Sequence, residues 1–310
     1  MTDAAEATDT TEANTTEAVP QSSAAAASAW ADELAFTIET ARAAGAILVD
    51  RYDRLERIHH KSATDVVTEA DHLSEELVIA AIRWRYPGDA ILAEESGAHE
   101  ARAATAANAG DAADGAEDSA STAPPPTNGR TWVIDPLDGT VNYANGLPVF
   151  CVSIALVADG RPVAGVVLDP SRDELFAATA DGPATLNGKP IEASDKPKLS
   201  DCVVSMALAG RSVVRRVRAV RKAVRASRSM GSAALALAYV GNGRFDAFLQ
   251  QSGLSPWDIA AAGLIAERAG AVVTTFDGRY WYDGSIATRT ANVVAAPGPH
   301  IERLRALARG

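Results

Sequence analysis

The chain has 310 residues, a formal net charge of −11 and 47% hydrophobic residues. This length allows one large domain or two small ones, and the hydrophobic fraction is high enough for a sizeable core. The first residues lack a basic region followed by an apolar run, and no apolar stretch reaches about 18 residues, so we expect neither a signal peptide nor a membrane-spanning helix. Cys151 and Cys202 form no C-x-x-C pair, which predicts reduced thiols in a cytoplasmic protein.

The negative charge is concentrated in two segments of low sequence complexity. Residues 1–29 contain five acidic residues and no Lys or Arg, and residues 97–129 contain five acidic residues and one Arg. Together they carry −9, which leaves −2 for the rest of the chain. Both are rich in Ala and poor in large apolar residues, so burial cannot offset the loss of chain entropy. The sequence predicts a disordered acidic tail at 1–29 and a disordered insertion at 97–129 within a folded domain at 30–310.

Hydrophobic periodicity predicts a layered arrangement of helices and strands. A first helix is expected from Ala31 to about Arg57 and a second from Glu69 to Trp84, with one face formed by Leu73, Leu77, Ala80 and Trp84. Short apolar runs predict strands at 90–96, 131–135, 149–157, 162–169 and 174–180, with hairpin turns at Asp159-Gly160, Asp181-Gly182 and Asn187-Gly188. Expected strands at 202–208, 244–250, 271–276 and 292–296 then accompany helices at 212–227, 231–240, 256–269 and the C-terminus. This order is typical of a mixed α/β protein.

Acidic residues stand at the ends of several of these apolar runs. Glu94 and Glu95 follow "AILA", Asp135 and Asp138 follow "TWVI", and Asp258 lies at the start of a helix. Each alone is best interpreted as a helix cap or an exposed turn acid. Together they would repel, because two unit charges about 4 Å apart cost about 4 kcal/mol at an effective dielectric constant near 20. Clustered carboxylates need cations among them, and oxygen ligands without a nearby Cys/His pair favour Mg²⁺ over zinc.

The stretch "WVIDPLDGTVN" combines the two acids that follow the second expected strand with a glycine turn. Gly139 and Thr140 bend the chain so that successive backbone N–H groups can point in one direction, as at a helix N-terminus, and this arrangement suits a phosphate. Acidic metal ligands beside phosphate-binding amides are typical of metal-assisted phosphoryl transfer to water.

Five segments carry a resemblance to a known family. They are "AEES" (93–96), "WVIDPLDGTVNY" (132–143), "PWDIAAAGLIAERAGA" (256–271), "KSATDVVTEAD" (61–71) and "RSMGSAALALAYVGNGRFDAF" (228–248). In order and spacing the chain resembles the inositol monophosphatase family of Mg²⁺-dependent, lithium-sensitive sugar-phosphate phosphatases. The resemblance implies a mixed α/β (α+β) fold, a five-layered αβαβα sandwich of the sugar-phosphatase type. It also implies a homodimer with two or three Mg²⁺ ions in each active site and a small phosphorylated substrate.

The resemblance implies metal-binding roles for five residues. Glu94, Asp135 and the carbonyl of Leu137 would hold the first ion, and Asp135, Asp138 and Asp258 the second. No covalent nucleophile is required, because water activated by a metal is a far better nucleophile than bulk water.

Further residues are implied in orienting the water and the substrate. Gly139 and Thr140 would contact the phosphate through backbone amides, and Thr140, supported by Asp71 and Glu94, would orient the attacking water. Lys61 would lie on a flexible loop that closes over the site. Two more expected substrate-binding positions are Ala233, where inositol enzymes contact the sugar, and Gln251, where they commonly carry a glutamate for the ring hydroxyls.

The substrate is therefore expected to be a small polyol or sugar phosphate, most similar to myo-inositol-1-phosphate. Histidinol phosphate, fructose 1,6-bisphosphate and 3′-phosphoadenosine phosphate are alternatives within the family. The basic run at 211–228 suggests nucleic-acid binding, but its valines recur at helical spacing and no aromatic residue is interleaved, which favours an amphipathic helix with a solvated face. A non-enzymatic alternative is a regulatory module that contacts RNA or protein.

Overall fold

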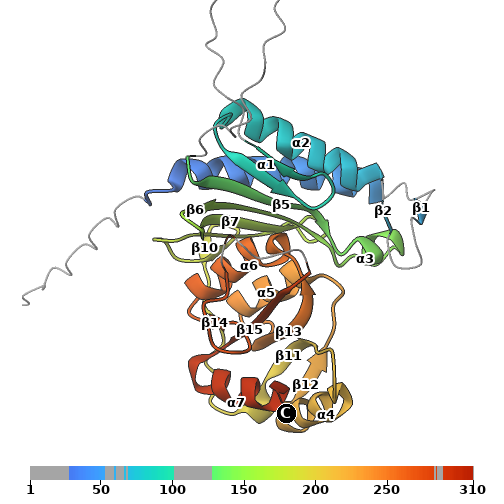
Figure 1. Ribbon diagram of the computed structural model, residues 1–310, viewed down its shortest axis with the longest axis vertical. Coiled ribbons are helices and arrows are strands. Elements are labelled where there is room, and N and C mark those ends of the chain that lie inside the picture. The colour runs from blue at the N-terminus through green and yellow to red at the C-terminus, as the bar shows by residue number, and fades with distance from the viewer. Residues whose placement is uncertain are drawn as a thin grey trace, which may run out of the picture.

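The computed structural model describes residues 28–52, 59–60, 66–67, 69–100, 128–282, 284 and 289–309. Its elements stack in five layers (Figure 1). Helices α1 (Ala31–Tyr52) and α2 (Glu69–Arg85) cover one sheet, α5 (Ala233–Gly241) and α6 (Pro256–Arg268) lie between the two sheets, and α4 (Val213–Ala223) and α7 (Gly298–Arg309) form the outermost layer. The expected mixed α/β sandwich of five layers is confirmed.

The first sheet has eight strands in the order β10-β9-β8-β7-β6-β5-β3-β4. Their bounds are β3 Ala90–Ala93, β4 Gly97–His99, β5 Arg130–Asp138, β6 Cys151–Ala158, β7 Arg161–Asp169, β8 Glu174–Thr179, β9 Thr185–Leu186 and β10 Lys189–Pro190. Strands β3 and β5 pair in parallel, and the other neighbours are antiparallel. Strands β1 (His59–His60) and β2 (Val66–Val67) pair with each other apart from this sheet.

Turn chemistry explains the hairpins of this sheet. Asp159-Gly160 joins β6 to β7 and Asn187-Gly188 joins β9 to β10, and in both pairs each residue has a positive φ of 50–76°. Two successive positive φ angles are characteristic of the type I′ turn, whose twist matches the flanking strands. The third expected turn, Asp181-Gly182, lies between β8 and β9. At the expected start of the insertion, Gly97–His99 pair with β3 as strand β4; residues 101–127 lie outside the described part, and the disorder expected there stays a prediction.

The second sheet has five strands in the order β12-β11-β13-β15-β14. Their bounds are β11 Val203–Ala207, β12 Ala226–Arg228, β13 Ala247–Leu254, β14 Val272–Thr274 and β15 Ala291–Ala296. The helix expected at 212–227 ends earlier than predicted, at Ala223. Val224 adopts an extended backbone with φ −111° and ψ 162°, and the chain then pairs in parallel with β11 as the edge strand β12. This edge pairing outweighs the helical periodicity of the valines.

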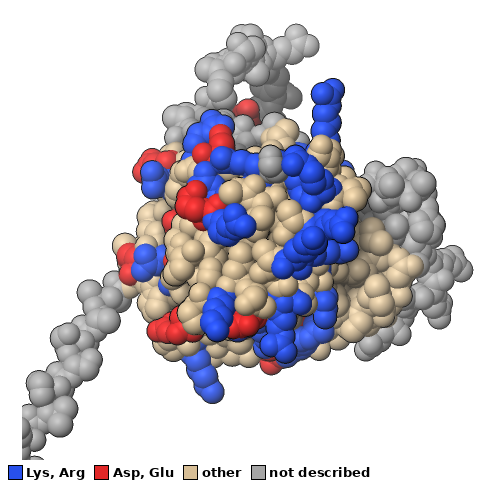
Figure 2. Space-filling model, turned by 90° about the horizontal axis from the view of Figure 1, so that it is seen from below, with Lys and Arg blue, Asp and Glu red and all other residues tan. Residues whose placement is uncertain are grey.

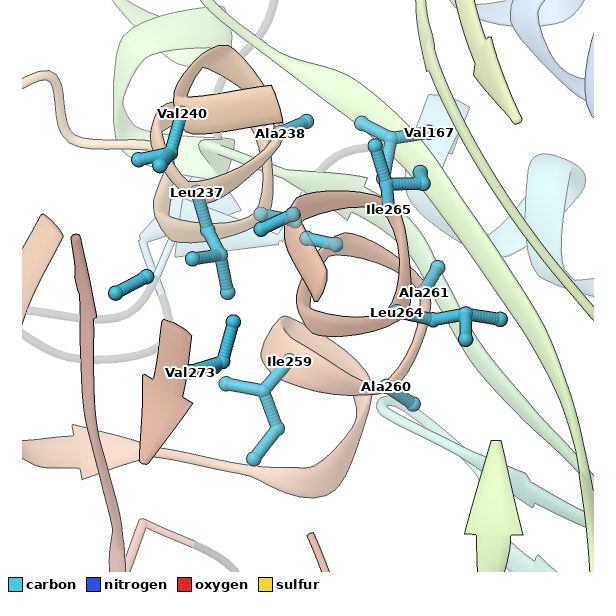
Figure 3. Close-up of a cluster of buried hydrophobic side chains, with 14 of the residues drawn as sticks. Val167, Leu237, Ala238, Val240, Ile259, Ala260, Ala261, Leu264, Ile265 and Val273 are labelled. Atoms are coloured by element: carbon cyan, nitrogen blue, oxygen red, sulfur yellow. The ribbon is translucent and has the colours of Figure 1, made fainter. Parts of the chain in front are cut away.

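The middle helix layer is apolar on every side because a sheet covers each face. All residues of α5 from Ala234 onward are buried, and α6 buries ten of its thirteen residues. Figure 3 shows this packing, with Leu237 of α5 on the side of α6 and Ile265 of α6 beside Val167 of the first sheet. A helix that is apolar all round is stable only when enclosed in this way.

The buried face of α2 is partly polar, and it is not the apolar face that the sequence predicted from Leu73 to Trp84. Trp84 is 83% exposed, whereas Ser74 and Glu75 are buried. The Ser74 hydroxyl donates to the carbonyl of Pro136 at 3.2 Å, and the Glu75 carboxylate accepts the backbone N–H groups of Glu95 and Ser96 at 3.0 and 2.9 Å. These polar groups tie α2 to the two loops that carry the acidic residues.

The first helix ends at Tyr52 within the described part, and residues 53–58 lie outside it.

Candidate metal centre

The two acids of "DPLD" are positioned by a bulge at the end of strand β5. Asp135 pairs with Ser153 of β6, and Asp138 pairs with Cys151, so three residue steps on β5 match two on β6. In a regular strand, residues three apart point to opposite faces, and one extra residue restores them to the same side. The bulge therefore allows both carboxylates to serve one site.

The third acid comes from the first turn of α6. Ser255 precedes this helix and Pro256 begins it, a favourable start because proline lacks the N–H that would have no helical partner. The Asp258 carboxylate accepts the backbone N–H of Ser255 at 2.5 Å. Asp135, Asp138 and Asp258 each offer a carboxylate oxygen, and these oxygens lie within 4.8 Å of one another. Residues 120 positions apart in the chain thus form one acidic cluster.

Asp138 is held by donors from the start of α5. Its carboxylate accepts the Ser232 hydroxyl at 2.5 Å and the backbone N–H groups of Ala234 and Ala233 at 2.7 and 3.2 Å. The expected substrate-binding residue Ala233 is therefore adjacent to the cluster. Such charge-assisted hydrogen bonds fix the orientation of the carboxylate.

Glu94 joins the same group of acids from the neighbouring strand. Its backbone N–H donates to the carbonyl of Ile134 at 3.2 Å, directly before Asp135, and the carboxyl groups of Glu94 and Asp135 share a hydrogen bond. Burial, followed by the charges of Asp138 and other neighbouring acids, raises the pKa of Glu94 to about 7. Four acids from three elements therefore meet at one place.

Burial also raises the pKa of each of the three aspartates, and repulsion by neighbouring acids adds to this effect at Asp135 and Asp258. Burial raises the pKa of Asp135 well above its usual range, and the charges of Glu94, Asp138 and Asp258 add to that effect. Burial and then the charge of Asp138 raise the pKa of Asp258 well above its usual range. The available ligand atoms are carboxylate oxygens, and burial and mutual repulsion disfavour their charged form. These properties fit a hard divalent cation, which would neutralise the charge and accept oxygen ligands.

The turn after Asp138 requires glycine for two reasons. Gly139 has φ 99° and ψ 29°, in the left-handed region that favours glycine. A Cβ atom at this position would lie 2.8 Å from the carbonyl oxygen of Val149. The next residue, Thr140, begins the short helix α3 (Thr140–Ala144), and its hydroxyl donates to the Leu137 carbonyl at 3.0 Å. Leu137 in turn donates its N–H to Asp135 at 3.0 Å, so the turn and the acids form one hydrogen-bonded unit.

The remaining expected site residues are placed differently. Asp71 is 1% exposed, in the first turn of α2, and it is not one of the three acids that cluster among the described residues. Gln251 lies on β13, and its side-chain oxygen accepts a hydrogen bond from the guanidinium of Arg216 on α4. Lys61 lies outside the described residues.

Three contributors were missed by the sequence reasoning. Ser232 directly precedes α5, where serine is a typical helix-capping residue, and this position could have indicated its place at the start of the helix. Glu75 resembled an ordinary exposed acid of α2. Arg216 was grouped with seven other basic residues of 211–228. It is, however, the buried basic residue of α4, with 4% of its surface exposed.

Comparison with known proteins identifies the family of this fold and site. Residues 30–309 match the inositol monophosphatase family. The chain belongs to the inositol monophosphatase family. The match begins at Trp30 and excludes the acidic N-terminal segment, so that segment is an addition to the family domain.

Related proteins carry more than one functional name. A protein from Xylella fastidiosa named Nus factor SuhB is 34% identical over 250 residues, covering 78% of this chain and 81% of that protein. A Thermotoga maritima protein named fructose-1,6-bisphosphatase/inositol-1-monophosphatase is 34% identical, covering 80% of this chain and 86% of that protein. The crystal structure of extragenic suppressor protein suhB from Bartonella henselae has a TM-score of 0.75 at 30% identity, with 90% of this chain and 98% of that chain covered.

Proposed function

We propose that this protein is a Mg²⁺-dependent phosphomonoesterase that hydrolyses a small polyol or sugar phosphate similar to myo-inositol-1-phosphate. The observation that carries the proposal is the cluster of Asp135, Asp138 and Asp258, with Glu94 hydrogen-bonded to Asp135. Family membership supports a phosphatase. Raised carboxyl pKa values at a buried cluster are characteristic of functional sites.

The chain's own residues have distinct parts in this proposal. Glu94, Asp135, Asp138, Asp258 and the Leu137 carbonyl would hold the ions. When bound, Mg²⁺ supplies an activated water and neutralises charge on the phosphate. Two or three ions per site, and sensitivity to lithium, are part of the proposal.

The turn beside the cluster would position the reacting groups. The Thr140 hydroxyl, held at the Leu137 carbonyl, and the Glu94 carboxylate would orient the water, with Asp71 behind them. Gly139 allows the backbone to approach the phosphate closely, because it has no side chain to obstruct that side. Lys61 is proposed to close over the bound substrate.

Specificity is proposed to be broad because of the chemistry at position 251. A glutamate there would accept hydroxyl groups through both oxygens, whereas the oxygen of Gln251 already accepts from Arg216. Its amide N–H₂ group remains a donor, and the Arg216 charge lies behind it. A second anionic group on the substrate is therefore less strongly repelled than by a glutamate. The bisphosphatase name of the Thermotoga maritima relative makes fructose 1,6-bisphosphate the first alternative substrate to test.

A regulatory role is the second candidate, and the names of relatives favour considering it. Several related proteins are named Nus factor SuhB, and such a role does not require phosphatase activity. The complete acidic cluster supports the enzyme. Among the described residues no helix is both long and apolar enough to cross a bilayer; a cytoplasmic homodimer is part of the proposal.

The decisive experiment measures phosphate release with and without Mg²⁺. Inositol-1-phosphate, glycerol-2-phosphate, histidinol phosphate, fructose 1,6-bisphosphate and 3′-phosphoadenosine phosphate form the substrate panel. We expect Mg²⁺-dependent turnover of several monophosphates, and calorimetry should detect Mg²⁺ binding that Asp258→Asn weakens. An intact fold that binds Mg²⁺ but hydrolyses none of the panel would contradict the enzyme and favour the regulatory role.

A further inference from the structure

The outermost helix layer is strongly basic although the protein as a whole is acidic. Residues 211–228 and 298–309 contain eleven Lys and Arg residues and one acidic residue, whereas the whole chain carries −11. Figure 2 views the molecule from this end and shows Lys and Arg side chains spread over the face. We call these two segments, which contain the packed helices α4 and α7, the basic layer.

The cations of α4 are exposed and lack acidic partners in the described part of the chain. Arg215, Arg218, Arg221 and Lys222 are exposed, and so are the flanking Arg211 and Arg225. None of them belongs to an ion pair among the described residues. Clustered like charges raise the local potential and attract an anionic partner.

A hollow lined by apolar and basic side chains lies along the same helix. It has a volume of about 490 Å³ and is lined by Val213, Val214, Val217, Arg218, Arg221 and Lys222. Val214 is 78% exposed. The three valines offer small aliphatic surface, and the three cations lie beside it. This combination suits a chain that alternates acidic residues with small apolar ones.

Other anionic partners fit this face less well. Single-stranded nucleic acids gain much of their binding energy by stacking on aromatic side chains, and neither α4 nor α7 contains Phe, Tyr or Trp. Helices that lie on membranes bury Trp, Phe or Leu, and in the described part of α4 and α7 the large apolar residue that is exposed is Val214.

We propose that the basic layer is the docking surface for the acidic N-terminal segment of this same chain, residues 1–27. That segment contains Asp3, Glu6, Asp9, Glu12 and Glu17, no Lys or Arg, and many Ala and Thr residues between the acids. Its charge complements the cations that line the hollow, and its small apolar side chains complement the valines. It lies outside the family domain, which begins at residue 30.

The segment is long enough to reach this layer. It leaves the fold at Ser28. The Ser28 hydroxyl donates to the Asp181 carboxylate at 2.5 Å, and the backbone N–H of Ala29 donates to the same carboxylate at 2.8 Å. Four layer spacings of about 10 Å separate α1 from α4 and α7, which amounts to about 40 Å. Glu12 is 16 residues before Ser28, and an extended chain of that length spans about 55 Å. The acids from Asp3 to Glu12 can therefore lie on the basic layer.

The test uses the full chain with its five N-terminal acids replaced by Asn or Gln, so that the surface is free. A fluorescent peptide of residues 1–27 should bind this protein at low salt and dissociate at about 0.5 M salt, because exposed charge pairs are screened. Arg218→Gln with Arg221→Gln should weaken binding by about three- to thirtyfold, as expected for two exposed ion pairs. Val214→Ser should also weaken it without changing the charge.

The controls separate docking from general attraction. Lys189→Gln with Lys198→Gln removes the same charge from exposed positions outside the layer and should change the affinity less than twofold. The unmodified full chain should bind the peptide at least fivefold more weakly, because its own segment competes. Equal binding by the two full-length proteins would overturn the proposal. Tighter binding of an oligouridine RNA than of the peptide, with the same dependence on Arg218 and Arg221, would overturn it in favour of a nucleic acid.

Discussion

The middle helix layer and the basic layer carry charge in opposite ways. The middle layer contributes Asp258 to a buried group of like charges, and burial raises the pKa of each aspartate in the cluster. The basic layer displays like charges to solvent, where water screens them. The degree of burial therefore distinguishes the two regions. The buried acids are stable in their charged form only with a cation among them, whereas the exposed cations remain charged in water and can attract an anionic partner.

The largest expected effect is the loss of activity when a cluster acid loses its charge. Asp135→Asn and Asp258→Asn each remove a proposed ligand, and we expect turnover to fall by at least about a thousandfold while the fold remains intact. Far-ultraviolet circular dichroism and calorimetric Mg²⁺ binding provide the controls. A variant with near-normal turnover would show that the cluster is not the catalytic centre.

Gly139→Ala is expected to cost several kcal/mol in the free energy of unfolding. A positive φ alone costs about 1–2 kcal/mol for a side chain, and the new Cβ would lie 2.8 Å from the Val149 oxygen. Gly146→Ala is the matched control, because Gly146 has φ 71° but no atom within 4 Å of its would-be Cβ. Urea titration should give a clearly larger loss at 139. Equal losses would mean that the Val149 contact can relax.

Without metal, the protein should become more stable as the pH falls from 8 toward 5. The folded-state pKa of Glu94 is about 7 against an ordinary value of 4.5. The folded state therefore keeps this proton up to about pH 7, whereas the unfolded state loses it near pH 4.5, so up to about 3 kcal/mol of stability is lost as the pH rises between these two values, with little further change above pH 7. Melting temperatures measured in EDTA check this, and saturating Mg²⁺ should flatten or reverse the trend. A metal-free protein more stable at pH 8 would contradict the raised pKa.

Gln251→Glu should have a smaller effect, mainly on KM. One carboxylate oxygen would pair with Arg216, and the other would accept a substrate hydroxyl where the amide now donates. We expect KM for inositol-1-phosphate to fall several-fold and kcat to stay within twofold, because the contact is remote from the reacting bond. The same variant should bind fructose 1,6-bisphosphate less well. Unchanged KM values for both substrates would show that position 251 does not contact them.

The smallest effect is expected in the basic layer. Arg218→Gln with Arg221→Gln should change the free energy of unfolding by less than about 0.5 kcal/mol and leave kcat unchanged. Chemical denaturation and a standard phosphatase assay provide both values. A large loss of stability would mean that these exposed cations have structural partners, and the contrast between the two layers would then weaken.

The sequence predicted residues whose role depends on local order and missed those whose role depends on packing. Asp135, Asp138 and Asp258 stand in short motifs, so their meeting could be anticipated. The bulge that turns Asp135 and Asp138 to one side depends on the register with β6 and is invisible in the motif itself. Gln251 was expected to contact the substrate, and its partner Arg216, 35 residues away in sequence, could not be anticipated because the periodicity of its helix indicated only a solvated basic face.

The end of helix α4 also depended on packing that the sequence does not show. The valine spacing of 212–227 predicted a helix over its whole length, yet the parallel edge of β11 recruits Ala226–Arg228 as a strand. Propensity is a weak prior that tertiary pairing overrides.

The position of α6 has a consequence for ion size. The chain at Gly165 of β7 approaches α6 so closely that a Cβ there would lie 2.8 Å from the Cα of Ala261, and a Cβ at Gly263 would lie 2.5 Å from the Trp281 ring. Helix α6 is thus closely packed at both glycines, and this packing is expected to restrain Asp258 relative to its acidic neighbours. Mg²⁺ binds oxygen at about 2.0–2.1 Å and Ca²⁺ at about 2.3–2.6 Å. If packing at the two glycines limits expansion of the cluster, we expect the site to bind Mg²⁺ in preference to the larger Ca²⁺.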